Sequence, residues 1–237
     1  MKIMISDGID SLTADTSDSE YPVSNLLDIY PQKRWQSLSS TSVLTILTTP
    51  SVSGIFICGT NAEAYIVTVK SIALALYETH TGTIANGRLF LLFDSTYSVN
   101  SVRIDITLVT SGPEGEDVYA GILRCGSVLD LPDPQYGLKS ERQDFSIKSE
   151  FSNGGLYVYK RQTPRAYELS LTLTHAEFEE LDDLYDTVGS APFPFLLAEE
   201  INRPDYWSGF FHVVDPPSGS YAYPTFIDCS LSLREAV

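Results

Sequence analysis

Short runs in which apolar and polar residues alternate make up most of the first half of the chain. The clearest run, SVRIDITLV at 101–109, is apolar at every second position. A period of two places the apolar side chains on one face of a strand and the polar side chains on the other. Similar runs, rich in β-branched and aromatic residues, occur at 42–49, 54–60, 65–71, 72–79, 88–95 and 118–125. Seven or eight strands at this spacing predict an antiparallel sandwich or jelly roll.

The pattern stops at 126–140, where Pro132, Pro134 and Gly137 interrupt it. A proline fixes φ and has no N–H to give to a strand ladder. We therefore place a domain boundary here, with a discoidin-like β-sandwich at 1–130 and a β-rich domain at 131–237. Strand patterns resume in the second domain, at 145–147, 156–160, 166–174, 193–199, 206–215 and 225–233.

One segment of the second half has the period of a helix. In THAEFEELDDLYDTVGS, at 174–190, apolar residues recur three or four positions apart. Thr174 and Glu177 have the spacing of a capping box, and Gly189 supplies a C-terminal stop. The predicted fold is therefore mainly β, an N-terminal jelly-roll sandwich followed by a β-rich domain with one α-helix near 175–188.

The charge balance excludes several kinds of partner. Fifteen Lys and Arg stand against 31 Asp and Glu, a formal net charge of −16. Nucleic acids and anionic membranes are bound through clustered Lys and Arg, and no basic stripe occurs here, so neither partner is expected. No apolar run approaches the roughly 18 residues of a membrane span, and MKIMISDGID lacks the pattern of a signal peptide. We expect the protein to fold in a cytoplasm.

No catalytic or metal-binding pattern emerges. Cys58, Cys125 and Cys229 are widely spaced and odd in number, which favours buried thiols over a disulfide framework or a zinc site. The three histidines, at 80, 175 and 212, are too scattered for a ligand motif, and no G-x-S-x-G elbow occurs. The segment 7–20 lacks the spacing of a calcium loop and is interpreted as a polar arm or loop. We expect no enzyme, no cofactor and no metal.

A glycosidase is the enzyme class hardest to dismiss, because it needs only two acids set across a sugar. The acids worth testing are Glu199, Glu200 and Asp205, which precede Trp207 in a loop-like stretch. A solvated loop is the simpler interpretation.

The segment SNLLDIYPQKRWQS, at 24–37, resembles the early loop of discoidin-like, galactose-binding-type jelly rolls. In such domains an Asn, an Asp and a Trp precede the first core strand, and here these are Asn25, Asp28 and Trp35. VNSVRIDI and VYAGILRCG follow where such domains place their closing strands. With AGILRCG and ELSLTLTHAEFEELDDLYDTVGSAPFPFLL, the layout resembles tailed-bacteriophage tail-tip or baseplate proteins of the distal tail type.

This second resemblance implies a structural subunit of a tail tip or baseplate that acts through protein–protein interfaces. It implies a homo-oligomer that contacts tube, hub or fibre proteins, assembled in the host cytoplasm and located in the virion. The alternative is a carbohydrate-binding module that attaches to host glycans. Trp35 and Trp207 are the candidate aromatics for a glycan or an interface, although a large ring such as Trp35 contributes most when it is buried as an anchor of the sandwich.

Overall fold

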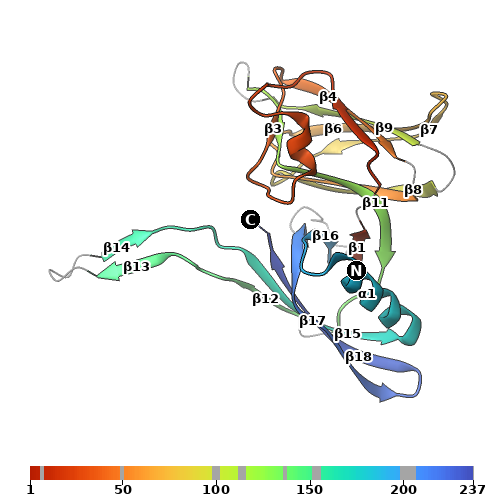
Figure 1. The fold of residues 1–237 in the computed structure, drawn as a ribbon, viewed down its shortest axis with the longest axis vertical. Helices are drawn as coiled ribbons and strands as arrows, with labels where there is room; N and C mark the ends of the chain where they lie inside the picture. Colours follow the sequence, from red (N-terminus) through yellow and green to blue (C-terminus); the bar gives the residue numbers. More distant parts are fainter. Residues whose placement is uncertain are drawn as a thin grey trace. The chain divides into compact units, whose positions relative to one another are not determined.

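The computed structural model describes residues 1–5, 8–48, 51–97, 102–111, 116–135, 138–150, 156–197 and 207–236. These form two compact units. The first comprises Met1–Leu131 and Phe193–Phe210, and the second comprises Pro132–Pro192 and Phe211–Val237. The chain passes between the two units three times, and each unit is described separately (Figure 1).

The first unit is a sandwich of two antiparallel sheets. One sheet has the strand order β2 (Ser11–Ala14), β4 (Thr41–Thr48), β9 (Val102–Val109), β6 (Ala64–Ser71), β7 (Leu76–Thr83). The other has the order β16 (Phe193–Leu196), β1 (Lys2–Ile5), β11 (Ile122–Asp130), β5 (Val52–Cys58), β8 (Arg88–Tyr97). A short pair, β3 (Trp35–Gln36) with β10 (Tyr119–Ala120), and the 3-10 helix η1 (Val23–Leu27) complete it. The prediction of a mainly β fold with an N-terminal sandwich is confirmed.

The alternating apolar and polar residues of the sequence lie on opposite faces of the strands. In β9 every second residue is buried in a core of aliphatic side chains between the sheets. On the outer face of β9, the Asp105 carboxylate accepts hydrogen bonds from Lys70 Nζ at 2.8 Å, Arg103 Nε at 2.8 Å and Thr45 Oγ1 at 2.9 Å. The sandwich therefore has an apolar interior and a polar cross-strand network outside.

Three parts of the first unit differ from the sequence prediction. The segment 7–20 is not wholly a loop, because β2 pairs with β4. The run 72–79 turns at its start, and the strand β7 begins only at Leu76. The segment 193–210 was expected in the second domain but belongs to the first unit, because β16 pairs with β1 through Lys2↔Leu196 and Ile3↔Phe195. Chain order does not reveal such long-range pairing.

The second unit is an antiparallel sheet with a helix packed on it. Its order is β12 (Lys139–Arg142), β15 (Arg165–Thr174), β18 (Phe226–Glu235), β17 (Ser208–Tyr223). The helix α1 (His175–Val188) begins and ends where the sequence predicts. The Thr174 hydroxyl accepts from Glu177 N at 3.3 Å and Glu177 Oε2 accepts from Thr174 N at 2.7 Å, which confirms the capping box.

A buried ion pair joins the ends of β15 and β18. Arg165 Nη2 and Nε donate to the two Glu235 carboxylate oxygens at 2.8 and 3.0 Å, and both side chains are less than a tenth exposed. The guanidinium carbon lies 5.2 Å from the ring centroid of Phe211, and despite burial the pair with Glu235 holds the pKa of Arg165 above its usual value. Such a bidentate pair fixes the register of the two strands.

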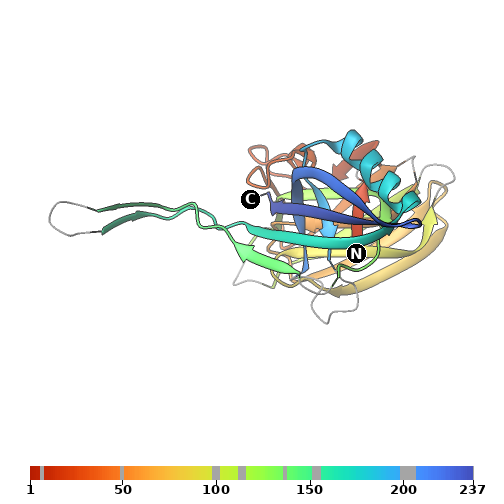
Figure 2. The ribbon, with the colours of Figure 1, turned by 90° about the horizontal axis from the view of Figure 1, so that it is seen from below.

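Between β12 and β15 the chain leaves the sheet and forms a separate two-stranded ribbon. We call residues 143–164 the arm; its strands are β13 (Ile147–Glu150) and β14 (Leu156–Tyr159). In both views the arm extends beyond β12 and β15, and neither of its strands joins the sheet (Figure 1, Figure 2). At its base, Gln143 N donates to Pro164 O at 3.0 Å, so the two ends of the arm are adjacent.

Candidate functional site

Trp35 lies in the core of the sandwich. Its side chain has no exposed area and belongs to the cluster that contains Leu26 and Ala120. Among the residues that the structure describes, none accepts a hydrogen bond from its buried Nε1. The ring therefore acts as an anchor of the sandwich and presents no face on which a sugar could stack.

Trp207, the other candidate aromatic, is half-buried, and its carbonyl oxygen accepts from Leu197 N at 3.1 Å. The candidate acids Glu199, Glu200 and Asp205 lie outside the described residues.

The three cysteines are buried free thiols, as their sequence contexts predict. Burial raises the pKa of Cys125 to about 12 and that of Cys229 to about 11. A thiol is nucleophilic only as the thiolate, so neither of these two is suited to covalent chemistry near neutral pH.

A cationic side chain stands between two aromatic rings in the first unit. The guanidinium carbon of Arg34 lies 5.1 Å from the ring centroid of Tyr21 and 4.8 Å from that of Tyr119. The pairing of β3 with β10 places Tyr119 opposite Gln36 and so beside Arg34. No carboxylate among the described residues forms a salt bridge with Arg34. We call Arg34, Tyr21 and Tyr119 the arginine cage; flanking rings hold a guanidinium rigid while its N–H edges can still donate.

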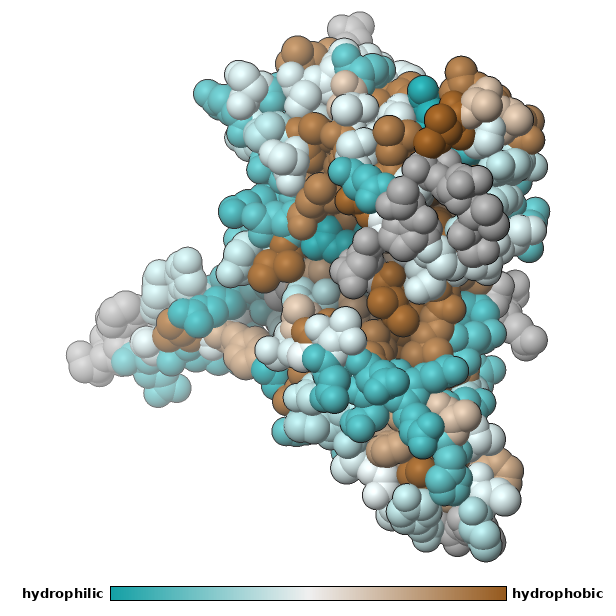
Figure 3. All heavy atoms as spheres, turned by 45° about the vertical axis from the view of Figure 1, so that its right-hand side comes forward, coloured by the Kyte–Doolittle hydropathy of each residue, from teal (hydrophilic) through white to brown (hydrophobic). Residues whose placement is uncertain are grey.

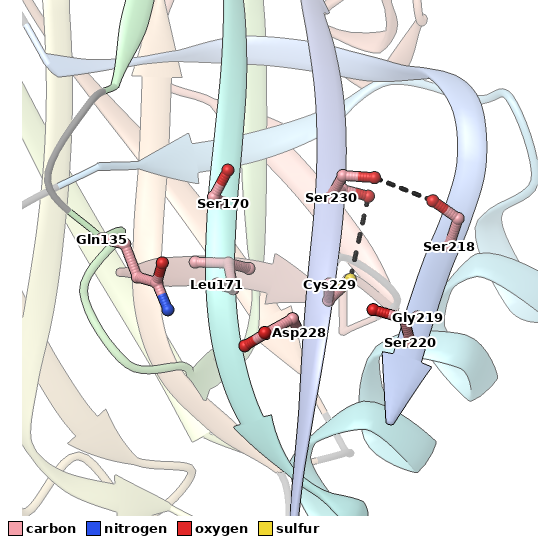
Figure 4. Close-up of a pocket in the computed structure, with 9 residues that line it drawn as sticks. All are labelled: Gln135, Ser170, Leu171, Ser218, Gly219, Ser220, Asp228, Cys229 and Ser230. Carbon is pink, nitrogen blue, oxygen red and sulfur yellow. Dashed lines mark hydrogen bonds between the residues drawn. The ribbon is translucent and has the colours of Figure 1, made fainter. Parts of the chain in front are cut away.

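A polar hollow of about 420 Å³ lies over the sheet of the second unit (Figure 4). Several of its polar side chains bond to one another or to neighbours. Ser218 Oγ lies 2.8 Å from Ser230 Oγ, and Thr172, which donates to Asp228 at 2.9 Å, also accepts from Gln135. No aromatic ring is among the residues that line the hollow, and its charged side chain, Asp228, already accepts a hydrogen bond from Thr172, so the hollow offers a ligand little beyond what water offers. We assign it no ligand.

The arm carries an apolar face of which about half is exposed to solvent. The register pairs Ile147 with Tyr159 and Ser149 with Tyr157, and side chains two residues apart share a face of a strand. Ile147, Tyr157 and Tyr159 therefore form one face, and they are 46, 51 and 54% exposed. Figure 3 shows hydrophobic and hydrophilic side chains mixed along this projecting segment.

The arm also differs from the rest of the chain in charge. Residues 139–164, which comprise β12 and the arm, contain five Lys and Arg against three Asp and Glu, whereas the remaining residues contain ten against 28. Lys139 and Lys148 are exposed, at 74 and 61% of their side chains. A slightly basic, partly apolar ribbon projects from a strongly acidic protein, which makes the arm the described surface best suited to bind a macromolecular partner.

Comparisons with known proteins give fold likenesses only. No family model and no curated protein matches the chain. A carbohydrate-binding module of Clostridium perfringens, solved with GalNAc-β-1,3-galactose, is 13% identical and covers 51% of this chain and 100% of its own, with a TM-score of 0.41. A family 32 module of the same organism, solved with galactose, is 16% identical and covers 54% of this chain and 100% of its own, with a TM-score of 0.40. A fucose-binding module of Streptococcus pneumoniae is 11% identical and covers 52% of this chain and 95% of its own, with a TM-score of 0.42.

These descriptions are of carbohydrate-binding modules, and none of the three names a tail protein. At these identities and TM-scores they assign no ligand to this chain, so its function is argued from its own residues.

Sequence reasoning missed both the arm and the arginine cage. The sequence predicts the arm only as two short strands, at 145–147 and 156–160, and its sole further signal is the local excess of Lys and Arg. In the cage, Tyr119 lies 85 positions after Arg34 and 98 after Tyr21, and no local pattern encodes that proximity.

Proposed function

We propose that the protein is a non-enzymatic structural subunit of a homo-oligomer. In this oligomer the arm of one copy binds the body of the next, where the body is the part of the chain outside residues 139–164. The observation that carries this proposal is the exposed face of Ile147, Tyr157 and Tyr159 on a ribbon that joins no sheet. A two-stranded hairpin is at best marginally stable in water unless its face packs against something. A partner surface that covers this face would stabilise the arm.

The choice of a second copy as the partner rests on charge. The body of each copy carries the large excess of Asp and Glu, while the arm with β12 carries a small excess of Lys and Arg. Complementary charge guides the arm of one copy toward the body of another, although body–body contacts would repel. A contact between two different patches on identical subunits is head-to-tail, and it gives a ring if the rotation closes.

The test is the molar mass of three proteins, measured by light scattering coupled to size-exclusion chromatography over a range of concentrations and salt. They are the wild type, an arm deletion that replaces 144–163 with a short Gly-Ser linker, and Ile147→Ser/Tyr159→Ser. The adjacency of Gln143 and Pro164 allows the linker to close without moving β12 or β15. We expect a wild-type oligomer that weakens as salt screens the charges, and monomers for both variants.

Ile66→Ser/Tyr221→Ser is the matched control, since it removes an isoleucine and a tyrosine that are 43 and 76% exposed and do not belong to the arm. It should assemble like the wild type. Circular dichroism of each variant shows whether its sheet is intact. A wild type that stays monomeric at every concentration, or an arm deletion that still assembles, would refute the proposal.

We propose further that this oligomer belongs to the distal tail of a bacteriophage, where it contacts tube, hub or fibre proteins. The support is the sequence resemblance at 24–37 and over the strand, helix and strand that end at 197. Negative-stain images should show closed rings, and mass spectrometry of purified virions should detect the chain. Open filaments, or absence of the chain from virions that package DNA normally, would contradict this assignment.

A second candidate function, glycan binding, is favoured by the arginine cage. A rigid guanidinium with aromatic neighbours can donate to sugar hydroxyls while a ring packs against the sugar face. A glycan array, followed by calorimetry, would detect saturable binding. Arg34→Ala should abolish it, and Lys33→Ala, which removes the adjacent charge but leaves the cage, should not. Binding that survives Arg34→Ala would place any glycan site elsewhere.

A further inference from the structure

Strand β8 is irregular opposite the start of β5. Val52 pairs with Tyr97 and Gly54 pairs with Leu92, so two steps along β5 correspond to five steps along β8. Extra residues of this kind release part of a strand from its ladder and redirect its side chains. Here the freed Asp94 N donates at 3.0 Å to Glu78 Oε2, which belongs to β7 in the opposite sheet. The irregularity thus joins the two sheets at one edge of the sandwich.

Three potential metal ligands meet at this edge. Glu78 and His80 are two residues apart on β7 and therefore lie on one face of that strand. One ligand atom from each of Glu78, His80 and Asp94 lies within 4.8 Å of the other two. His80 Nε2 is 3.3 Å from Glu78 Oε2, and the His80 ring stacks on Phe93 with centroids 6.1 Å apart.

The Glu78 carboxylate is buried but not fully bonded. Its side chain is only 8% exposed, and within the described part of the chain Oε1 has no hydrogen-bond partner. His80 Nε2 is likewise buried without a hydrogen-bond partner among those residues. A buried polar atom without a partner costs about 1–3 kcal/mol, and more when it is charged. A cation in contact with both atoms would remove that cost.

Nearby charges strengthen this conclusion. Asp94 is exposed and places a second carboxylate beside Glu78. Two clustered carboxylates repel each other unless a positive charge stands between them.

We propose that Glu78, His80 and Asp94 form a binding site for one divalent transition metal ion, represented by Zn²⁺. Neutral imidazole and carboxylate oxygens are common zinc ligands, whereas calcium and magnesium favour oxygen donors alone. Three protein ligands leave a fourth position for water, and the exposure of Asp94 gives access from solvent. The ion would link β7 of one sheet to β8 of the other and so stabilise this edge of the sandwich.

A purely structural contact between His80 and Glu78 is the competing explanation. It needs no metal and predicts no stoichiometric metal binding at pH 7.5. Metal titration therefore distinguishes the two explanations directly.

The test is calorimetric titration of Zn²⁺ into the tag-free, chelator-treated full chain at pH 7.5, with Tm measured in parallel. We expect one ion per chain and a Zn²⁺-dependent rise in Tm. Glu78→Gln, His80→Gln and Asp94→Asn should each weaken binding by about tenfold or more. Because Asp94 is exposed, Asp94→Asn keeps the test valid even if the two buried variants fold poorly. The absorption of bound Co²⁺ provides a second readout of histidine ligation.

His175→Gln and Asp186→Asn are the controls, since both residues are exposed and lie on α1. They should bind Zn²⁺ like the wild type. The proposal is overturned if no stoichiometric binding occurs, if binding survives Asp94→Asn and His80→Gln unchanged, or if Ca²⁺ binds in preference to Zn²⁺. These outcomes do not depend on whether the chain assembles through its arm.

Discussion

Replacing Trp35 tests how the sandwich uses its largest buried side chain. Two variants separate the contribution of the ring from that of its N–H. Trp35→Ala removes the whole ring, and Trp35→Phe keeps an aromatic ring but removes the pyrrole part and its donor. The structure predicts unequal costs, because Nε1 is buried and bonds to no described residue.

The magnitudes follow from that environment. Truncating a fully buried Trp to Ala typically destabilises a protein by about 3–5 kcal/mol, through lost burial and the cavity left behind. Trp35→Phe loses fewer atoms, at a cost of about 2 kcal/mol on the same scale. It also removes a buried unpaired donor that costs about 1–3 kcal/mol in the wild type. The two terms nearly cancel, so we expect Trp35→Phe to change the free energy of unfolding by about 1 kcal/mol or less in either direction.

Urea unfolding followed by far-UV circular dichroism measures both variants, with Trp207→Phe as a control at a half-buried tryptophan. Unchanged m-values would show that only stability has changed. A loss of about 3 kcal/mol or more in Trp35→Phe, close to that of Trp35→Ala, would refute the reasoning. It would mean that the Nε1 hydrogen is bonded in the folded protein, for example to a buried water molecule.

Three further predictions concern other contacts. Glu235→Ala removes the buried partner of Arg165 and should cost about 3–5 kcal/mol in urea unfolding, whereas Glu168→Ala, from the exposed pair with Lys139, should cost less than about 1 kcal/mol. Thr174→Ala should lower the stability of α1 by about 0.5–2 kcal/mol in thermal unfolding, and Thr174→Ser should restore most of it. Although burial opposes the change, hydrogen bonds from Lys70, Arg103 and Thr45 lower the pKa of Asp105 below its usual value of 3.8. The stability that Asp105 contributes is therefore present above about pH 4 and is lost as the pH falls through the lowered value, so Asp105→Asn should reduce the acid-side loss seen in pH-dependent unfolding.

The elements with strong local periodicity were predictable from sequence. The alternation in β9 and the capping box of α1 are each encoded within a few residues, so pattern alone placed them. β1 and β2 were missed because each is only four residues long and lies among polar residues. Their strand conformation depends on pairing with β11 and β4, which are distant in sequence. Local propensity is too weak to specify such elements.

The arm shows a different limit of sequence reasoning. Its strands have the alternation of ordinary strands, and Tyr157 and Tyr159 have the composition of a core-facing strand. A period of two indicates that one face differs from the other, and it does not indicate what covers that face. Only the structure shows that β13 and β14 pair with each other alone and that their apolar face is exposed.

The proposed metal site was hidden for a related reason. Glu78 and His80 sit where the alternation of β7 places inward-facing side chains, and polar residues at inward positions count against a strand prediction. Their third partner, Asp94, arrives through an irregularity in β8 that no hydrophobic pattern announces. Along most strands the apolar side chains are buried and the polar ones are exposed. The arm departs from this rule by exposing apolar side chains, and the cluster of Glu78, His80 and Asp94 departs from it by burying the polar side chains of Glu78 and His80. Because β4, β9 and β15 follow the alternation of buried and exposed residues, such exceptions are where a requirement other than folding is expected. A partner surface and a bound cation are the two requirements that would satisfy them.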